Sequence, residues 1–551
     1  MRTLSILTSS FLFCLVTNVL QASNKPVLAK EQILRIGNAV EPKEIDPAIA
    51  TGAPEGHIIE ALFEGLTSVG PFSTDPVPGV AESWTVSPDG LKYIFKIRKN
   101  AKWSDGKALT AEDFVYSWTR VLEPKLASEY AYQLYYIKNG EAFNLGKIKD
   151  PKQLGVKALD AYTLEVQLEH PTAFFLYLTA FQTLYPTPKH VLDKFPDLNW
   201  TRPENMVCNG PFKLAEAKMH QHLKLVPNEY YWQKEAVKLK EIYIYPIENK
   251  YTEEKTFVAG QIHMTSNVPA MRVPYYESLP KNDAKTYNPF RAEPLYGLYY
   301  YRFNTTRKPF NDPRVRRALA LTIDRKEIVD KIIRGGKMPA TSFTPPFGAY
   351  EFKGHLPLQM TDEVLQEAKK LLAQAGYAEG KNFPKVDILY DTDEDNKRIA
   401  VAIQQMWHKN LGIHVGLYNQ EWKVYLESLR KLDFDIGRSR WLADYPDPNT
   451  FLDLSVTNGG NNNTGWSNKS YDESIQKAAL TVDAKQRFSL LKNAEDILMK
   501  ELPVIPIFYY TNTRLVAKNV KIFNPKTNEL SEWKSDIMDR MFFKYYALSE
   551  K

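Results

Sequence analysis

Charged and aromatic side chains that could bind a zwitterionic ligand are concentrated in the stretch Trp422–Asp453. The local pattern predicts a helix, then a strand, then a loop broken by prolines. Opposite charges in such a loop can each face an opposite charge of the ligand, while the rings supply apolar walls. An ordinary surface loop has the same composition, so the surrounding elements must show whether this stretch is a binding site. The residues of interest here are Arg438, Arg440, Trp441, Asp444, Tyr445 and Asp447.

Catalytic patterns are missing from the sequence. There is no G-x-S-x-G, no H-E-x-x-H and no complete phosphate-binding loop, since Gly335-Gly336-Lys337 lacks the upstream glycine and the following Ser or Thr. His220 and His222 could place two imidazoles on one strand face, but two histidines without a third ligand are usually surface residues. We therefore expect binding without catalysis, with no metal and no cofactor.

The composition is that of a soluble globular protein, with 44% hydrophobic and 25% charged residues. A chain of 551 residues is long enough for two or three domains. The net charge of +6 is dilute and no Lys/Arg block stands out, which argues against a nucleic-acid binder. The 32 tyrosines favour a binding protein, because each offers a stiff surface with a polar tip, although a place in the core is the simpler explanation for any single one.

The first residues predict export. Met1-Arg2 gives a positive start, Ile6–Leu20 is an apolar run, and Ala22 offers a small residue before Ser23. The run is short for a membrane span, so we expect a cleaved signal peptide over residues 1–22 and a soluble mature protein. Cleavage removes Cys14 and leaves Cys208 as the one remaining cysteine, so an internal disulfide is excluded. We expect Cys208 to be a small buried side chain of the core.

The C-terminal half predicts an α/β lobe. Val386–Tyr390, the helix Asn396–Leu411 and Ile413–Tyr418 form a βαβ pattern, and the helix Lys423–Arg430 with the strand Phe434–Arg438 repeats it. Such a pattern predicts a mostly parallel sheet, whose ligands lie at the carboxyl ends of the strands. The candidate stretch follows a predicted strand at that end.

The block Ala81–Pro124 is the most specific part of the sequence. It predicts a hairpin at Pro88-Asp89-Gly90, a strand, a second turn and a helix capped by Thr110. Its pattern resembles the signature of bacterial family 5 extracellular solute-binding proteins, which serve ABC importers of peptides and nickel. The matching residues are Ala81, Trp84, Ser87, Asp89, Gly90, Tyr93, Phe95, Arg98, Trp103, Asp105, Gly106, Ala111, Asp113, Phe114, Val115, Ser117 and Arg120.

The resemblance covers nearly the whole mature chain and is closest to the periplasmic oligopeptide binders. It implies an α/β fold like that of type II periplasmic binding proteins, with two lobes joined by a hinge and an extra family-5 subdomain. The expected division is a signal peptide over 1–22, lobe I over 23–63, 190–296 and 510–551, the extra subdomain over 64–189, and lobe II over 297–509. The hinge is expected near Tyr296–Leu298 and Ile507–Tyr510.

The resemblance also implies the function. Family members close two lobes over an extended peptide, bind its main chain and ends, and deliver it to an ABC permease in the inner membrane. We expect a periplasmic protein, a monomer, with short peptides as ligands. The resemblance implies that Asp444 pairs with the peptide amino group, that Arg438 meets a carboxylate, and that aromatic residues line the cleft. These aromatic residues are Trp422, Trp441 and, from the other side, Tyr130.

Simpler roles exist for each of these residues. Asp444 could pair with Arg438 or Arg440, Arg438 could form a structural ion pair, and the rings could belong to the core.

Several positions depart from the enteric oligopeptide binders. Those proteins carry two bonded cysteines where this chain has Gly297 and Leu442. Leu429 stands in place of an arginine, Asn396 in place of a histidine and Thr51 in place of a glutamate. The amino-end anchor is thus retained and the carboxyl-end contacts are altered, which leaves the peptide length open. A murein or signalling peptide, heme, a nickel chelate or another small solute on the same fold stays an alternative, as does a peptide-holding chaperone or a hydrolase.

Overall fold

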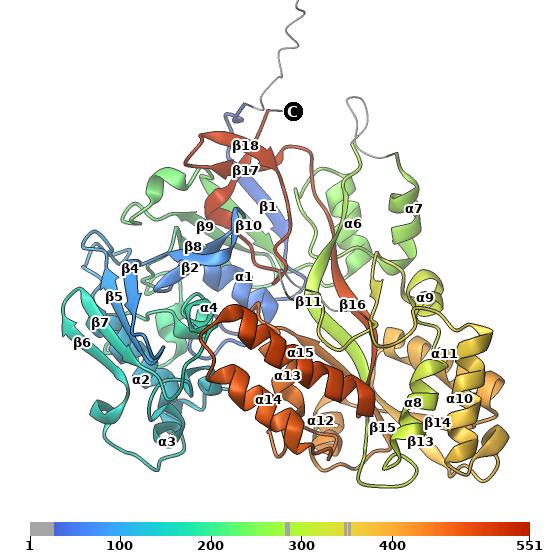
Figure 1. The fold of residues 1–551 in the computed structure, drawn as a ribbon. Helices are drawn as coiled ribbons and strands as arrows, with labels where there is room; N and C mark the ends of the chain where they lie inside the picture. Colours follow the sequence, from blue (N-terminus) through green and yellow to red (C-terminus); the bar gives the residue numbers. More distant parts are fainter. Residues whose placement is uncertain (1–26, 281–286, 347–349, 351–353, 551) are drawn as a thin grey trace, which may run out of the picture.

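The computed structural model describes residues 27–280, 287–346, 350 and 354–550. The predicted signal peptide over residues 1–22 lies outside these residues. Within them, no helix is both long enough and apolar enough to cross a membrane. Figure 1 shows the N-terminal strands and the C-terminal strands together at one end of the molecule, with the remaining elements in two groups below them.

Lobe I is built on a four-stranded sheet in which β1 pairs in parallel with β10, while the other pairs are antiparallel. The side chains of β1 alternate, so Leu34 and Ile36 are fully buried. Helices α1, α6 and α7 and a small C-terminal sheet complete it. The bounds are β1 Ile33–Gly37, β10 Glu241–Tyr245, β9 His222–Pro227, β8 Phe212–Lys218, α1 Ala53–Leu62, α6 Lys250–Val258, α7 Val273–Ser278, β17 Val520–Asn524, β18 Glu529–Glu532 and β19 Tyr546–Leu548.

The extra subdomain has an antiparallel sheet in the order β4-β5-β7-β6, a hairpin and several short helices around α2. Helix α2 begins where expected, because the Thr110 N–H donates to the Asp113 carboxylate. It buries Phe114 and Trp118 against the subdomain. The bounds are β2 Thr67–Gly70, β3 Ser73–Pro78, β4 Ala81–Val86, β5 Lys92–Ile97, β6 Val156–Asp160, β7 Thr163–Gln167, α2 Ala111–Leu122, α3 Gly140–Asn144, α4 Phe175–Leu178 and α5 Lys189–Leu192.

Lobe II contains a six-stranded sheet in the order β12-β16-β11-β15-β13-β14, together with helices α8 to α15. The strand bounds are β11 Phe290–Phe303, β12 Met338–Pro339, β13 Val386–Asp391, β14 Val415–Gln420, β15 Ile436–Leu442 and β16 Val504–Leu515. The helix bounds are α8 Pro313–Leu321, α9 Arg325–Glu327, α10 Asp362–Gln374, α11 Glu394–Leu411, α12 Trp422–Arg430, α13 Asn449–Leu452, α14 Lys469–Ala479 and α15 Ala484–Glu501.

The prediction of a mostly parallel sheet in lobe II is wrong. Strand β13 is parallel to β14 and β15, as the βαβ pattern requires, but β15, β11, β16 and β12 pair with one another in antiparallel fashion. The reason is that the chain enters lobe II along β11 and leaves it along β16, so these two strands run in opposite directions and no crossover helix makes them parallel.

Two long strands link the lobes. Strand β11 pairs with β16 over Phe290–Pro294 and again from Leu298 onward, with a shift of register between these two parts. The first part lies beside lobe I and the second belongs to the lobe II sheet (Figure 1). A break in register bends and twists a strand pair, so the two parts of the ladder need not be coplanar.

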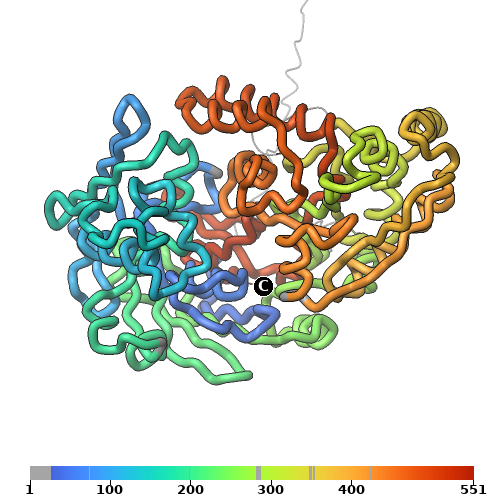
Figure 2. The backbone as a smooth tube through the Cα atoms, turned by 90° about the horizontal axis from the view of Figure 1, so that it is seen from below, coloured from blue at the N-terminus to red at the C-terminus, as the bar shows by residue number. Residues whose placement is uncertain are grey.

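The buried apolar side chains of the described residues form two large clusters and two small ones. The first large cluster draws its members from residues 34–264 and 516–548, with Tyr445 as the single addition, and includes the buried Cys208. The second large cluster draws its members from residues 296–509. Seen from below, the extra subdomain in blue to teal and the yellow and orange part of lobe II lie on opposite sides of the molecule (Figure 2).

One local expectation differs from the structure. Strand β15 continues to Leu442, so Arg438, Arg440 and Trp441 lie on the strand and not in the loop after it.

Candidate functional site

Two adjoining cavities lie between lobe II and the rest of the molecule. The larger, of about 1430 Å³, is bounded by the extra subdomain and lobe II, and the smaller, of about 610 Å³, by lobe I and lobe II. Arg438, Arg440 and Leu442 line both cavities. Strand β15 therefore runs between the two parts of one interlobe cleft.

Strand β15 presents a free edge to this cleft. It pairs with β11 from Ile436 to Leu442, but with β13 only at Ile436 and Gly437. Because antiparallel pairing uses the backbone groups of alternate residues, the other groups of residues 438–442 point away from β11. Among the described residues no strand covers this edge; the Tyr425 hydroxyl donates to the Arg438 carbonyl.

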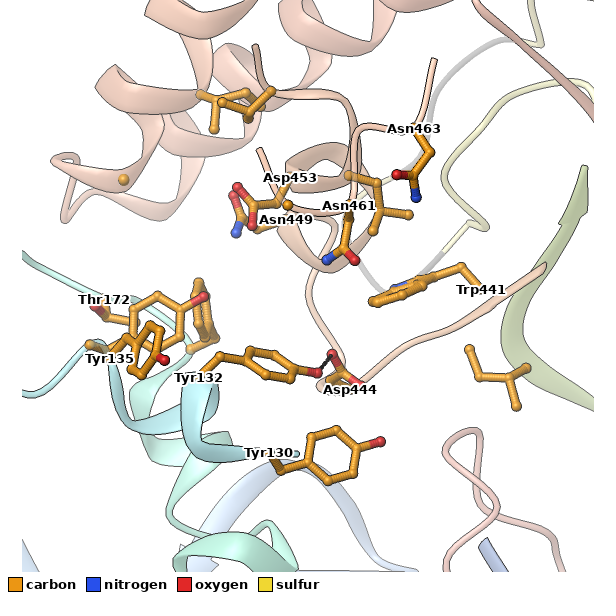
Figure 3. Close-up of a pocket in the computed structure, with 18 of the residues that line it drawn as sticks. Tyr130, Tyr132, Tyr135, Thr172, Trp441, Asp444, Asn449, Asp453, Asn461 and Asn463 are labelled. Carbon is orange, nitrogen blue, oxygen red and sulfur yellow. Dashed lines mark hydrogen bonds between the residues drawn. The ribbon is translucent and has the colours of Figure 1, made fainter. Parts of the chain in front are cut away.

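Asp444 follows the end of this free edge. Its carboxylate accepts a hydrogen bond of 3.2 Å from the Tyr132 hydroxyl, which reaches across the cleft from the extra subdomain (Figure 3). Within the described part of the chain it forms no ion pair, so the alternative pairing with Arg438 or Arg440 does not occur. The Asp444 side chain is half-buried, because it faces the cavity. Burial raises the pKa of its carboxyl group to about 6, although the hydrogen bond from Tyr132 acts to lower this pKa.

Thr450 fixes the approach to Asp444. Its hydroxyl oxygen accepts the Trp441 indole N–H at 3.1 Å and the Asp444 backbone N–H at 3.3 Å. The Trp441 ring is half-buried and lines the larger cavity. One threonine on α13 thus holds both an aromatic wall and the main chain that carries the carboxylate.

Arg438 is paired within the protein. Its guanidinium donates to the Asp391 carboxylate at 2.9 Å and lies 4.7 Å from the centre of the Tyr299 ring. Asp391 ends β13, and its carboxylate also accepts from the Asn396 amide at 3.0 Å. The simpler role, a structural ion pair, is therefore present, and an added carboxylate would have to compete with Asp391.

The extra subdomain supplies a wall of aromatic rings. Tyr130 contacts Phe181 edge-on at 5.5 Å and Tyr132 at 5.7 Å, and both tyrosines line the larger cavity (Figure 3). Further along this wall, Phe174 stacks on Tyr445 of lobe II at 4.1 Å. Trp422 begins α12, but its side chain lies outside the described residues.

Sequence reasoning missed several residues that the fold brings to the cleft. Tyr132 follows Tyr130 by two residues in a short 3-10 turn and reaches Asp444. Tyr300, Arg302 and Ser439 face the larger cavity from β11 and β15. Of these residues, only Arg302 could have been noticed in the sequence. It lies inside the apolar stretch LYYYRFN, where a charged residue is unusual because charged residues are rarely buried.

The two histidines considered for metal binding are not in the cleft. His222 lies 3.2 Å from Glu216, and His220 is largely exposed beside Glu41. Among the described residues, no group of three or more His, Cys, Asp or Glu side chains could hold a metal ion.

Asp447, another charge of the candidate stretch, has a partner inside lobe II. Both carboxylate oxygens accept from the Arg487 guanidinium, at 2.7 and 2.8 Å, and both side chains are buried. Such a bidentate pair orients the loop that carries Asp444.

We predict that Asp447→Ala lowers the free energy of unfolding by about 3–5 kcal/mol, because it leaves the Arg487 charge buried and unpaired. Denaturant unfolding at pH 7 measures this change. Asp444→Ala is the control, since Asp444 has no ion-pair partner and its loss should cost little. Equal stability of the two variants would contradict a structural role for the Asp447–Arg487 pair.

Gly297 and Leu442, the positions of the missing cysteines, lie directly opposite each other on β11 and β15. A Cβ on Gly297 would lie 2.5 Å from the Leu442 Cδ2 atom, so the leucine occupies the space over the glycine. Opposite residues in an antiparallel ladder have Cα atoms about 4.5–5.5 Å apart, a separation that a disulfide spans.

We predict that the double variant Gly297→Cys/Leu442→Cys forms a disulfide and gains about 2–4 kcal/mol of stability under oxidising conditions. The single variant Gly297→Cys should be less stable than the parent, because its Cβ meets Leu442. Thiol labelling of the denatured protein and unfolding with and without reductant check both points. A double variant whose introduced thiols stay free would refute the geometry.

The architecture, an interlobe cleft beside a free strand edge, is that of an extracytoplasmic solute-binding protein. The family model described as bacterial extracellular solute-binding proteins, family 5 Middle, matches residues 75–463. The chain belongs to this family, and its fold is the type II periplasmic binding fold with two lobes, a hinge and an extra subdomain.

The similarity to individual proteins extends over nearly the whole chain. It is 39% identical over 505 residues to the oligopeptide-binding protein OppA of Bacillus subtilis (strain 168), covering 90% of this chain and 91% of that protein. The solved unliganded open form of the periplasmic murein tripeptide binding protein MppA superimposes with a TM-score of 0.80 at 36% identity, covering 96% of this chain and 99% of that one. Haemophilus influenzae OppA in complex with the peptide RPPGFSPFR gives 0.74 at 33% identity, covering 95% and 100%.

Proposed function

We propose that this protein is the substrate-binding component of an ABC importer and binds short oligopeptides in the interlobe cleft. The observation that carries the proposal is the free edge of β15, which leads directly to the Asp444 carboxylate. An extended peptide can add to this edge as a further strand through its main chain, which is the same for every sequence. Its protonated amino group then pairs with Asp444.

The other predicted residues have roles consistent with this placement. Trp441 and Tyr130 supply walls on the two sides of the larger cavity, and we keep Trp422 as a third wall. Arg438 meets the peptide carboxylate when that group displaces or joins Asp391. The cleft is large enough for varied side chains together with water, which accommodates different peptides at little cost. Binding of this kind requires no catalysis.

We propose the lobe boundaries given by the sequence, with a hinge where β11 and β16 cross between the lobes. Two separate hydrophobic clusters and the register shift between Pro294 and Leu298 support this division. Closure about two strands would bring Tyr130 and Asp444 around the ligand.

Location and partners follow from the same proposal. A cleaved signal peptide over residues 1–22 exports the protein to the periplasm, where it acts as a monomer and delivers peptide to the inner-membrane permease. The periplasmic relatives that bind oligopeptides and murein peptides support this location and this class of ligand. No nucleic acid takes part.

Ligand carried through purification tests the proposal most directly. Mass spectrometry of the denatured protein should release peptides, and calorimetry with peptides of two to five residues should detect binding to the ligand-free protein. Failure to find or bind any peptide in this range would refute the proposed function.

We predict that Asp444→Asn weakens peptide binding by about 2–5 kcal/mol, or roughly 30-fold to several thousand-fold, because the bound ammonium loses its charged partner. Calorimetry with one tight-binding peptide measures the loss. The variant should fold at least as well as the parent at pH 7: burial raises the pKa of Asp444, so its ionised form destabilises the folded state above that pKa. Unchanged affinity would remove Asp444 from the site.

We also predict that peptide affinity falls as the pH drops through about 6. The free Asp444 carboxyl has a pKa of about 6, and only its ionised form pairs with the peptide ammonium, which stays protonated in this range. Below pH 6 the affinity should decrease by up to about tenfold per pH unit. The Asp444→Asn variant should show no such dependence between pH 5 and 7, and a wild-type affinity that is flat over this range would contradict the assignment.

A further inference from the structure

Arg302 is a buried cation that has no acidic partner among the described residues. It lies on β11, is 7% exposed and lines the larger cavity. Its Nη2 atom donates to the Tyr300 hydroxyl at 2.8 Å and to the Ser439 hydroxyl at 2.5 Å, while Nε and Nη1 have no hydrogen-bond partner in the part of the chain that the structure describes. No carboxylate of the described chain lies within ion-pair distance of it. An uncompensated buried charge is costly, which calls for a partner from outside the chain.

The strand register brings the three side chains together. Tyr300 and Arg302 are two residues apart on β11 and face the same side of the sheet, and Ser439 stands opposite Tyr300 on β15. Arg438, one residue before Ser439, faces the other side, where Asp391 neutralises it. The sheet therefore has a paired arginine on one face and an unpaired arginine on the other.

The hydrogen bonds of this group leave two protons without an acceptor. A guanidinium only donates, so the hydroxyls of Tyr300 and Ser439 both accept from Arg302. The O–H proton of each hydroxyl has no acceptor among the described residues. Two hydroxyl donors backed by a buried positive charge form a site for an anion with two acceptor oxygens.

We propose that Arg302, Tyr300 and Ser439 form a subsite for a carboxylate side chain of the bound peptide. The proposal rests on the peptide-binding function above. Ser439 lies within the β15 strand, five residues before Asp444, so the ligand residue concerned lies after the first residue of the peptide. The neighbouring lining residues Tyr425 and Leu429 are buried and uncharged at this end of the cavity, which strengthens a charge-assisted hydrogen bond there. Aspartate, glutamate and a cell-wall diaminopimelate residue share the required group.

The test is a positional scan by calorimetry. Tri-, tetra- and penta-alanine peptides are compared with versions carrying Glu, Gln or Lys at position two, three or four. At one of these positions Glu should bind at least about tenfold more tightly than Gln, the difference expected for a hydrogen bond to a charged group. A tripeptide with diaminopimelate at the preferred position, compared with its Glu counterpart, separates a cell-wall source from a protein source.

Variants then assign the preference to these residues. Arg302→Met should bring the Glu-to-Gln affinity ratio to about one while polyalanine still binds, and Arg302→Lys should retain part of the preference. Ser439→Ala and Tyr300→Phe remove one hydroxyl proton each and should lower the ratio without unfolding the protein. Arg440→Met is the matched control, because it removes another arginine that lines the cavity on the same strand pair and should leave the ratio unchanged.

The outcomes separate the two proposals. If wild-type protein binds no peptide, the proposed function fails and the subsite fails with it. If polyalanine binds but Glu and Gln are equal at every position, only the subsite is refuted. A Glu preference that survives in Arg302→Met with its polyalanine affinity intact would also refute the subsite.

Discussion

The pairing of strand β15 is the constraint on which the rest of the site depends. This strand has a partner on one side over its full length and a partner on the other side for only its first two residues. No strand of the described residues covers the remaining edge, and backbone groups at an exposed edge favour the addition of another strand. The two cavities lie on either side of this edge, and the Asp444 carboxylate follows its end.

The charges along the edge differ in how they are compensated. Arg438 on one face has Asp391, and Asp447 in the following loop has Arg487, so both serve the fold. Asp444 and Arg302 have no ion-pair partner in the described chain. The Asp444 carboxylate accepts a hydrogen bond from the Tyr132 hydroxyl, and the Arg302 guanidinium donates one to the Ser439 hydroxyl. Since unpaired buried charges lower stability, the two that remain mark where a ligand of opposite charge would contribute most.

Neighbouring positions on the strands stand where the resemblance to the enteric oligopeptide binders implies a pair of bonded cysteines. Gly297 and Leu442 are opposite each other, and the leucine side chain fills the space that a second Cβ would need. Strands β11 and β15 are joined by a ladder that runs along β11 from residue 297 to 303. The lobe therefore keeps its strand pairing without the cross-link.

The sequence alone indicated the family, many of the local elements and Asp444 as the proposed anchor for the peptide amino group. Local periodicity and capping predicted α2 and the βαβ unit, because these depend on residues close in the chain. The signature around Ala81–Pro124 identified the family, and the resemblance singled out Asp444 from the other charges of its loop. Only the tertiary structure decided which charges are paired. Asp391 is 47 residues from Arg438, and Ser439 is 137 residues from Arg302, so no local pattern could match them. The antiparallel half of the lobe II sheet was not predicted from the sequence, because it depends on the chain entering the lobe along β11 and leaving it along β16.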